Sequence, residues 1–275
     1  MNKQHTETEE RTEQKVKNKI SLAFASGKKA FIPFLTAGDP DAASTVSFIL
    51  EMEKAGANLI EIGIPFSDPT AEGVVIQDAN LRALKGGMTT DGVFEIVRQV
   101  REQSQVPLVF MTYLNPVFHY GYDAFFSKCE ELGVDGIIIP DLPYEEKEEV
   151  ELPAAAHNVS LISMIAPTSE NRIQKIAREA EGFLYLVSSM GVTGIRSEIQ
   201  TDLESIVKSI RKVTTLPCAV GFGISTPEQA AKMAAISDGS IVGSAIVKQI
   251  AEQGRAAAPQ LSAYVKAMRQ ALDSL

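Results

Sequence analysis

A glutamate stands inside an apolar segment of this sequence. Glu61 belongs to residues 59–64, LIEIGI, in which the other side chains are aliphatic or absent. Burying a charge there is costly in free energy unless the charge is paired or has a function in binding or catalysis. Apolar surroundings also raise the pKa of a carboxyl group toward neutrality, which suits proton transfer. Glu61 is therefore the first candidate for a catalytic acid or base; the alternative is a structural carboxylate held by a neighbouring donor.

Two further carboxylates follow in the loop at residues 65–73, PFSDPTAEG. Its prolines and glycine predict an irregular segment that can fold back over the end of the preceding strand. Asp68, between Ser67 and Pro69, is more typical of a turn or a partner contact than of a catalyst. Glu72 fits a second catalytic carboxylate and an ordinary loop residue equally well.

Three glycine-containing turns follow late apolar segments: residues 191–194 (GVTG), 221–223 (GFG) and 243–244 (GS). Glycines expose backbone N–H groups, and Ser244 can begin a helix whose N-terminus favours an anion. The pattern predicts a phosphate site at the last two turns, although each turn by itself can be a plain turn.

Other kinds of chemistry find little support in the sequence. His5, His119 and His157 are scattered, so we expect neither a metal site nor a Ser-His-Asp set. No phosphate-loop or dinucleotide fingerprint occurs. No lysine falls convincingly at the end of an apolar run, which disfavours imine chemistry.

Eight short apolar runs alternate with longer helical patterns, and most are apolar throughout, as strands covered on both faces should be. This alternation predicts a single (β/α)8 TIM barrel, with an open doubly wound sheet as the alternative. In a barrel the site lies at the C-terminal ends of the strands. The expected strands are residues 31–36, 59–64, 107–113, 136–139, 161–165, 183–187, 218–221 and 240–242.

The N-terminal region divides into two expected parts. Residues 1–13 are polar and without periodicity, which predicts a disordered tail. From residue 14 to about Gly27, Val16, Ile20, Leu22 and Phe24 indicate an extra helix that caps one end of the core. The barrel domain is therefore expected to span residues 14–275.

The composition excludes several classes of protein. The chain has 275 residues, a net charge of −9, and a globular content of 45% hydrophobic residues. The acidic balance argues against nucleic acid, and no apolar stretch approaches the ~20 residues of a membrane span. Cys129 and Cys218 fit reduced, buried thiols. We expect a cytoplasmic protein.

Four segments resemble the tryptophan synthase α subunit family: residues 31–40 (FIPFLTAGDP), 61–69 (EIGIPFSDP), 191–194 (GVTG) and 221–225 (GFGIS). The resemblance runs from about Ile20 to Ile250. It implies a TIM barrel that splits indole-3-glycerol phosphate into indole and glyceraldehyde 3-phosphate by a cofactor-free retro-aldol reaction. Another phosphosugar barrel would share the glycine turns but not residues 61–69.

The resemblance also implies roles for individual residues. Glu61 would protonate indole C3 and then accept the proton of the side-chain hydroxyl, while Glu72 would hold or deprotonate the indole N–H. Thr193 would hydrogen-bond Glu72. The implied phosphate ligands are Gly194, Gly223, Gly243 and Ser244, and the implied indole contacts are Phe34, Ile76, Tyr113, Tyr185, Phe222 and Ile241.

A β subunit that carries pyridoxal phosphate is the partner that the resemblance implies, in an αββα heterotetramer. The loops around Asp68 and around residues 115–116 would face that subunit, and residues 188–198 would close as a lid. No cofactor is implied in this chain.

The sequence departs from the family pattern at the second carboxylate. Where the family reads Ala-Asp-Gly-Pro, this chain reads Ala71–Glu72–Gly73–Val74. The charge is kept, but the side chain is one methylene longer and the rigid proline is missing, and a displacement of about 1 Å can cost on the order of 10²-fold in rate. From the pattern, Glu72→Asp is expected to preserve or raise activity. The alternative function is a weakly active subunit that binds ligand and chiefly activates its partner.

Overall fold

A computed structural model describes residues 19–275 of the chain, except residues 26, 188–195 and 222. The predicted tail and residues 14–18 of the expected N-terminal helix therefore lie outside the described residues. The strands alternate with helices along the chain: β1 Ala30–Thr36, β2 Ile60–Gly63, β3 Leu108–Met111, β4 Gly136–Ile138, β5 Ser160–Leu161, β6 Ser163–Ile165, β7 Leu184–Val187, β8 Cys218–Gly221 and β9 Gly239–Val242.

The strands pair in parallel and form a nearly closed barrel, as predicted. One detail differs from the expected eight strands, because residues 161–165 are not one strand. They divide at Ile162 into β5, which pairs with β4, and β6, which pairs with β7. The Ile162 N–H still donates to the Ile137 carbonyl at 2.8 Å. The chain therefore changes neighbours at the place where the sheet closes on itself.

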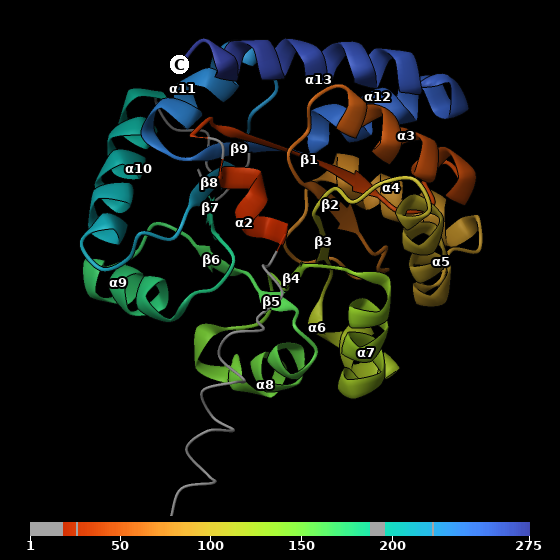
Figure 1. Cartoon of the computed structure of the whole chain (residues 1–275), viewed down its shortest axis with the longest axis horizontal. Helices are drawn as coiled ribbons and strands as arrows, with labels where there is room; N and C mark the ends of the chain where they lie inside the picture. Colours follow the sequence, from red (N-terminus) through yellow and green to blue (C-terminus); the bar gives the residue numbers. More distant parts are fainter. Residues whose placement is uncertain (1–18, 26, 188–195, 222) are drawn as a thin grey trace, which may run out of the picture.

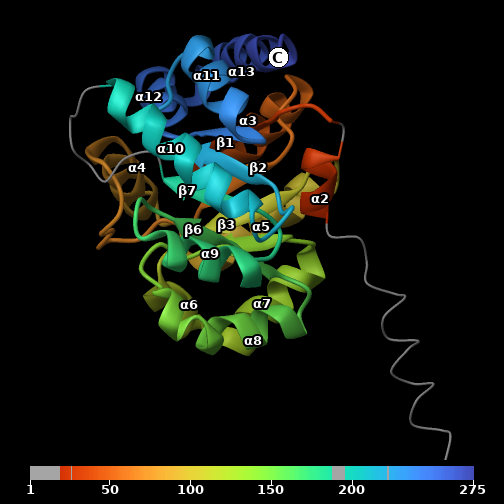
Figure 2. The same ribbon diagram turned by 90° about the vertical axis from the view of Figure 1, so that its left-hand side faces the viewer.

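Helices surround the strands (Figure 1), and a view turned by 90° gives the same arrangement (Figure 2). Two connections hold a pair of helices where one crossover helix would suffice, α4 and α5 after β2 and α6 and α7 after β3. The described helices are α2 Lys19–Phe24, α3 Ala42–Lys54, α4 Val74–Lys85, α5 Thr90–Arg101, α6 Leu114–Tyr120, α7 Tyr122–Leu132, α8 Glu148–Ala156, α9 Glu170–Glu179, α10 Arg196–Arg211, α11 Pro227–Ile236, α12 Ser244–Gln253 and α13 Ala258–Asp273.

The predicted N-terminal helix is present in its second half as α2. Ile20 is completely buried and belongs to the cluster of side chains that fills the barrel. The Phe24 ring packs on the Phe183 ring at 5.7 Å between centroids. Leu22, in contrast, is 58% exposed. The helix thus closes one end of the core with part of the apolar face that the sequence indicates.

The strands are apolar throughout because both of their faces are covered. One set of alternating side chains packs against the helices, and the other set fills the barrel interior. The interior set includes Ile32, Phe34, Leu59, Val109, Met111, Ile138, Ile162, Phe183, Tyr185, Ala219 and Ile241.

Side-chain caps fix the starts of two helices. The side chain of Asp41 caps α3 by accepting the Ser44 N–H at 2.8 Å. Thr226 caps α11 in a reciprocal capping box with Gln229, and Pro227 occupies the first turn. The second of these caps fixes the loop that follows β8, which matters for the site below.

Candidate active site

A cavity of about 430 Å³ opens at the C-terminal ends of the strands, the end at which barrel enzymes carry their sites. Its volume lies in the range of small-molecule sites. The described residues that line it are Phe34, Glu61, Ala71, Glu72, Gly73, Val75, Ile76, Met111, Pro140, Met164, Tyr185, Gly223, Ile224, Ser225, Ile241, Gly243, Ser244, Ala245 and Lys248.

Glu61 enters this cavity from the middle of β2, with its backbone in register with Phe34 of β1 and Val109 of β3. The residue is 1% exposed, and neither of its carboxylate oxygens has a hydrogen-bond partner among the described residues. Burial, and secondarily the charge of Glu72, raise the pKa of Glu61 to about 8. Glu61 is therefore mostly protonated at neutral pH and can donate a proton.

Two glycines make room for aromatic walls around Glu61. A Cβ atom at Gly63 would approach the Phe34 ring to 2.7 Å, and one at Gly221 would collide with the Tyr185 ring. Burial raises the pKa of the Tyr185 hydroxyl well above its usual value, and the nearby Glu61 charge adds to this shift. The walls keep the surroundings of Glu61 apolar, which is the cause of its own raised pKa.

Glu72 reaches the same cavity from the loop between β2 and α4. Two side chains of α4 hold this residue: the Gln77 amide donates to the Glu72 backbone carbonyl, and the Asn80 amide donates to Glu72 Oε2, each at 2.7 Å. Burial raises the pKa of the Glu72 carboxyl, and the Asn80 hydrogen bond opposes that rise. The two carboxyl groups therefore differ in their hydrogen bonding, although they share one cavity.

Tyr113, an indole contact that the resemblance implies, is not among the described residues that line this cavity. It is 1% exposed, and its hydroxyl accepts the Ala71 N–H at 3.0 Å. Its ring packs on Phe66 with 5.5 Å between centroids. Tyr113 thus contacts the loop that carries Glu72, and a contact with indole stays a prediction.

Backbone groups that could hold an anion lie where β8 and β9 end. Gly243 precedes the first turn of α12, whose leading N–H groups have no partner within a helix. Gly223 has a φ of +74°, which favours glycine, and nothing lies within 4 Å of the position of its absent Cβ. Hydrogen bonds from Ser225 and Thr226 to the Gln229 side chain hold this loop against α11.

Most of the predicted site residues come together in this one cavity. They are Phe34, Glu61, Glu72, Ile76, Tyr185, Gly223, Ile241, Gly243 and Ser244. Thr193, Gly194, Phe222 and most of the expected lid at residues 188–198 lie outside the described residues. Their predicted contacts stay predictions.

Sequence reasoning missed several lining residues, and three of them, Met111, Met164 and Lys248, could have been found from their spacing. Met111 and Met164 face the barrel interior near the ends of β3 and β6, a position that counting every second residue from the strand centres would have found. Lys248 lies one helical turn beyond Ser244 on α12, at the i+4 spacing that places two side chains on one face. This cation would have been found from the predicted helix start.

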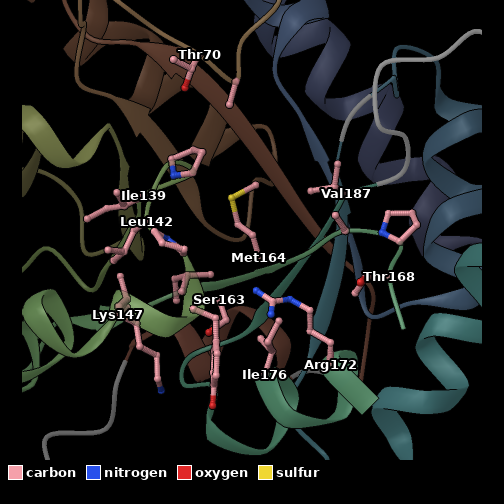
Figure 3. Close-up of a pocket in the computed structure, with 18 of the residues that line it drawn as sticks. Thr70, Ile139, Leu142, Lys147, Ser163, Met164, Thr168, Arg172, Ile176 and Val187 are labelled. Carbon is pink, nitrogen blue, oxygen red and sulfur yellow. The ribbon is translucent and has the colours of Figure 1, made fainter. Parts of the chain in front are cut away.

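A second, larger cavity of about 960 Å³ adjoins the first. Ala71, Glu72, Gly73, Pro140 and Met164 line both cavities. Met164 from β6 and Arg172 from α9 project into the larger cavity, and Lys147 lies at its side (Figure 3). Glu72 and Met164 therefore stand at the boundary between the two spaces.

The described residues hold no group of three or more His, Cys, Asp or Glu side chains placed to bind a metal ion. Among the helices in the described ranges, none is long and apolar enough to cross a membrane. The cavity contains two carboxyl groups, Glu61 with a raised pKa and Glu72 held by an amide, beside a helix start whose N–H groups could hold an anion.

Comparisons with known proteins show the family to which the sequence is similar. The sequence model of the family described as "Tryptophan synthase alpha chain" matches residues 20–273. A curated protein of that description from Lacticaseibacillus casei is 49% identical over 246 residues, covering 90% of this chain and 92% of the relative.

Solved structures are similar over nearly the whole chain. The tryptophan synthase subunit alpha of Legionella pneumophila has a TM-score of 0.85 and 39% identity, with 94% of this chain and 99% of that chain covered. A structure that addresses mutual activation of the tryptophan synthase a2b2 complex from Pyrococcus furiosus has a TM-score of 0.80 and 39% identity, covering 88% of this chain and 98% of that chain.

Proposed function

The chain belongs to the tryptophan synthase alpha chain family, and we propose that Glu61 and Glu72 together carry out the reaction of that family at the mouth of the barrel. The protein is a carbon–carbon lyase that cleaves indole-3-glycerol phosphate to indole and glyceraldehyde 3-phosphate in tryptophan biosynthesis. The family needs no cofactor for this step. The observation that carries the proposal is the buried Glu61, which has no hydrogen-bond partner in the described part of the chain and lines a cavity together with Glu72.

Proton donation from Glu61 starts the reaction. The protonated carboxyl transfers its proton to C3 of the indole ring, which becomes an indolenine cation that can accept electrons. A pKa of about 8 keeps this acid protonated at neutral pH, so the donor is ready before substrate enters.

Bond cleavage follows from the return of a proton. The Glu61 carboxylate takes the proton of the hydroxyl on the carbon bonded to the ring, the O–H electrons form the aldehyde C=O, and the carbon–carbon bond breaks. Its electron pair restores the C2–C3 double bond of indole, and the ring nitrogen regains its lone pair. Glu72 acts as the carboxylate that holds the ring N–H while positive charge develops there.

Binding divides between apolar and polar parts of the cavity. Phe34, Ile76, Tyr185 and Ile241 contact the indole ring in this proposal, and Tyr113 and Phe222 add to them. The phosphate binds the N–H groups of Gly194, Gly223, Gly243 and Ser244, with the N-terminus of α12 favouring the negative charge. The exposed position of Gly223 and the open space beside it support this assignment. Thr193 hydrogen-bonds Glu72 in the closed lid.

The proposed partner is a β subunit that carries pyridoxal phosphate, in an αββα heterotetramer within the cytoplasm. The similar structure from Pyrococcus furiosus concerns an a2b2 complex of that organism's tryptophan synthase. Exposed Asp68, on the loop after β2, and Phe118 of α6, which is 63% exposed, support a contact face near the barrel mouth.

Indole release from indole-3-glycerol phosphate, with and without an added β subunit, tests the proposed function. We expect release by the unmodified chain, loss in Glu61→Gln and in Glu72→Gln, and no change in Glu95→Gln, a matched change of an exposed glutamate on α5. Absence of release by the unmodified chain with its partner would refute the lyase reaction. A rise in β-subunit activity without indole release would support the activating subunit instead.

A further inference from the structure

Two side chains from the first turns of α4 donate hydrogen bonds to Glu72. Gln77 and Asn80, five and eight residues further along, hold its backbone carbonyl and its carboxylate respectively, each at 2.7 Å. Asn80 is 3% exposed, so this amide is committed to the interior and not to solvent. A buried side-chain amide that donates to a carboxylate makes a charge-assisted hydrogen bond, which is stronger than a neutral one.

The helix itself is fixed to the barrel by an ion pair. Arg82 of α4 donates from Nε and Nη2 to the two carboxylate oxygens of Asp39, at 2.9 and 2.8 Å. Asp39 follows β1 and is 1% exposed. Such a two-bond pair fixes direction as well as distance. Asn80 therefore sits on an element that cannot slide along its axis without breaking this ion pair.

The position of Asn80 bears on the unusual length of the second carboxylate. An aspartate at position 72 would withdraw the carboxylate by one methylene, on the order of 1.5 Å, and a 2.7 Å hydrogen bond would become too long to count. We propose that Asn80 is a positioning residue of the site: it fixes the Glu72 carboxylate at the reach of a glutamate side chain and favours its charged form. This inference rests on the proposed function, because it assumes that Glu72 acts on the indole N–H.

Charge considerations give Asn80 a second effect. The Nδ2 atom of Asn80 can only donate, so its hydrogen bond favours the ionised form of Glu72 and opposes the rise in pKa that burial causes. Among the described residues, Glu61 of β2 and Tyr113 after β3 interact with the Glu72 charge. The other titratable or charged side chains that line the two cavities are Tyr185 of β7, Lys248 of α12, Tyr144, Lys147, Glu151 and Arg172. Lys147 and Arg172 are already paired with glutamates. Asn80 is the hydrogen-bond donor that the structure gives to the Glu72 carboxylate.

An exchange of side-chain length tests the positioning directly. The family pattern alone leads to the expectation that Glu72→Asp preserves or raises activity. With Asn80 in its place, the change should instead lower kcat on the order of 10²-fold, because the carboxylate is displaced and loses its hydrogen bond to Asn80. Asn80→Gln adds the missing methylene on the other partner, so the double variant Glu72→Asp with Asn80→Gln should recover about tenfold over Glu72→Asp. Equal kcat in the single Glu72→Asp variant and the unmodified chain, or no recovery in the double variant, would overturn the proposal.

The pH profile of kcat supplies a readout that a purely structural role would not change. Removing the donor in Asn80→Ala raises the pKa of Glu72, so the acidic limb should move to higher pH by about one unit. The rate loss should then be about tenfold greater on the acidic limb of the profile than on its plateau. Gln77→Ala is the matched control, because it removes a bond to the backbone carbonyl of the same residue and should leave the acidic limb in place.

The two possible failures can be told apart. If the unmodified chain with its β subunit releases no indole, the proposed function fails. If it releases indole while Asn80→Ala keeps the acidic limb unchanged, or Gln77→Ala moves it equally, the role of Asn80 fails. Circular dichroism checks the folding of each variant. If Asn80→Ala does not fold, Asn80→Ser, which keeps a small donor, replaces it. The acidic limb of the Asn80→Ser profile should move by a smaller amount in the same direction, and an unmoved limb would contradict the proposal.

Discussion

Two buried carboxyl groups of the barrel, Asp135 and Glu61, have opposite surroundings. Asp135 immediately precedes β4; its carboxylate accepts the Leu108 N–H at 2.9 Å and lies 3.4 Å from an Arg101 nitrogen. Glu61 lies in β2 and lines the cavity, without a hydrogen-bond partner among the described residues. Burial raises the pKa of both groups, but a backbone N–H and nearby cations oppose the rise for Asp135.

The difference separates a group that holds the fold from one that serves the reaction. The Arg101 guanidinium beside Asp135 also donates to the carbonyls of Val106 and Gly133, each at 2.7 Å, so it connects three segments at the N-terminal rim. Glu61 makes no such connection among the described residues and offsets the cost of its burial by staying protonated. A carboxyl group in that state is poised for proton transfer and contributes nothing to holding the strands together.

Glu61→Gln should produce the largest effect, a loss of indole release of at least about 10³-fold, because the amide cannot transfer the proton. Measurement of kcat with the β subunit present checks this, together with binding of a non-cleavable substrate analogue, which should change little. Retention of more than about a tenth of the activity would remove Glu61 from the mechanism and end the contrast with Asp135.

Asp135→Ala should destabilise the protein by about 3 kcal/mol, since it leaves Arg101 buried without its carboxylate. Urea unfolding followed by circular dichroism measures the loss. The kcat of the folded protein should stay near that of the unmodified chain, because Asp135 lies at the rim away from the cavity. A fall in kcat without a fall in stability would contradict the division of roles.

Glu61→Gln should also stabilise the fold, by about 3 kcal/mol at pH 7. The folded-state pKa of about 8 is above the ordinary value of 4.5, so the native state loses stability progressively as pH rises from about 4.5 to about 8. The variant lacks this titration, and its advantage should therefore disappear near pH 4.5. Unfolding free energies at pH 5 and pH 7 check this; an equal difference at both would mean that Glu61 does not titrate as its burial implies.

Lys248→Ala should give the smallest effect, a rise in KM of about threefold with kcat unchanged, because an exposed charge near a phosphate contributes little. The side chain is 68% exposed and lies 3.9 Å from Glu252. Addition of about 0.5 M salt should abolish the difference between variant and unmodified chain. A large fall in kcat would place Lys248 in a role closer to that of Glu61.

Much of the barrel could be predicted because both faces of its strands are buried. The continuous apolar runs at residues 31–36 and 218–221 agree closely with β1 and β8. The division of residues 161–165 at Ile162 could not be predicted, because the sequence there is as strand-like as elsewhere and the break arises from closure of the sheet. The contact of Tyr113 could not be predicted either. Tyr113 continues the alternation of Val109 and Met111, which face the barrel interior, but its hydroxyl accepts the N–H of Ala71 in the loop after β2.

The sequence by itself determined that a carboxyl group at position 61 would be costly, because Glu61 has aliphatic neighbours on both sides, and that late turns would expose backbone N–H groups. It also places a carboxylate at position 72, where the family pattern has an aspartate. Tertiary structure decided whether these groups meet and which of them has a partner. The Asn80–Glu72 hydrogen bond and the Arg82–Asp39 ion pair each join residues of different segments. Lys248 lines the cavity together with Ser244, one turn earlier on the same helix. Hydrogen bonds depend on distances of a few tenths of an ångström, which only the packing of whole elements sets.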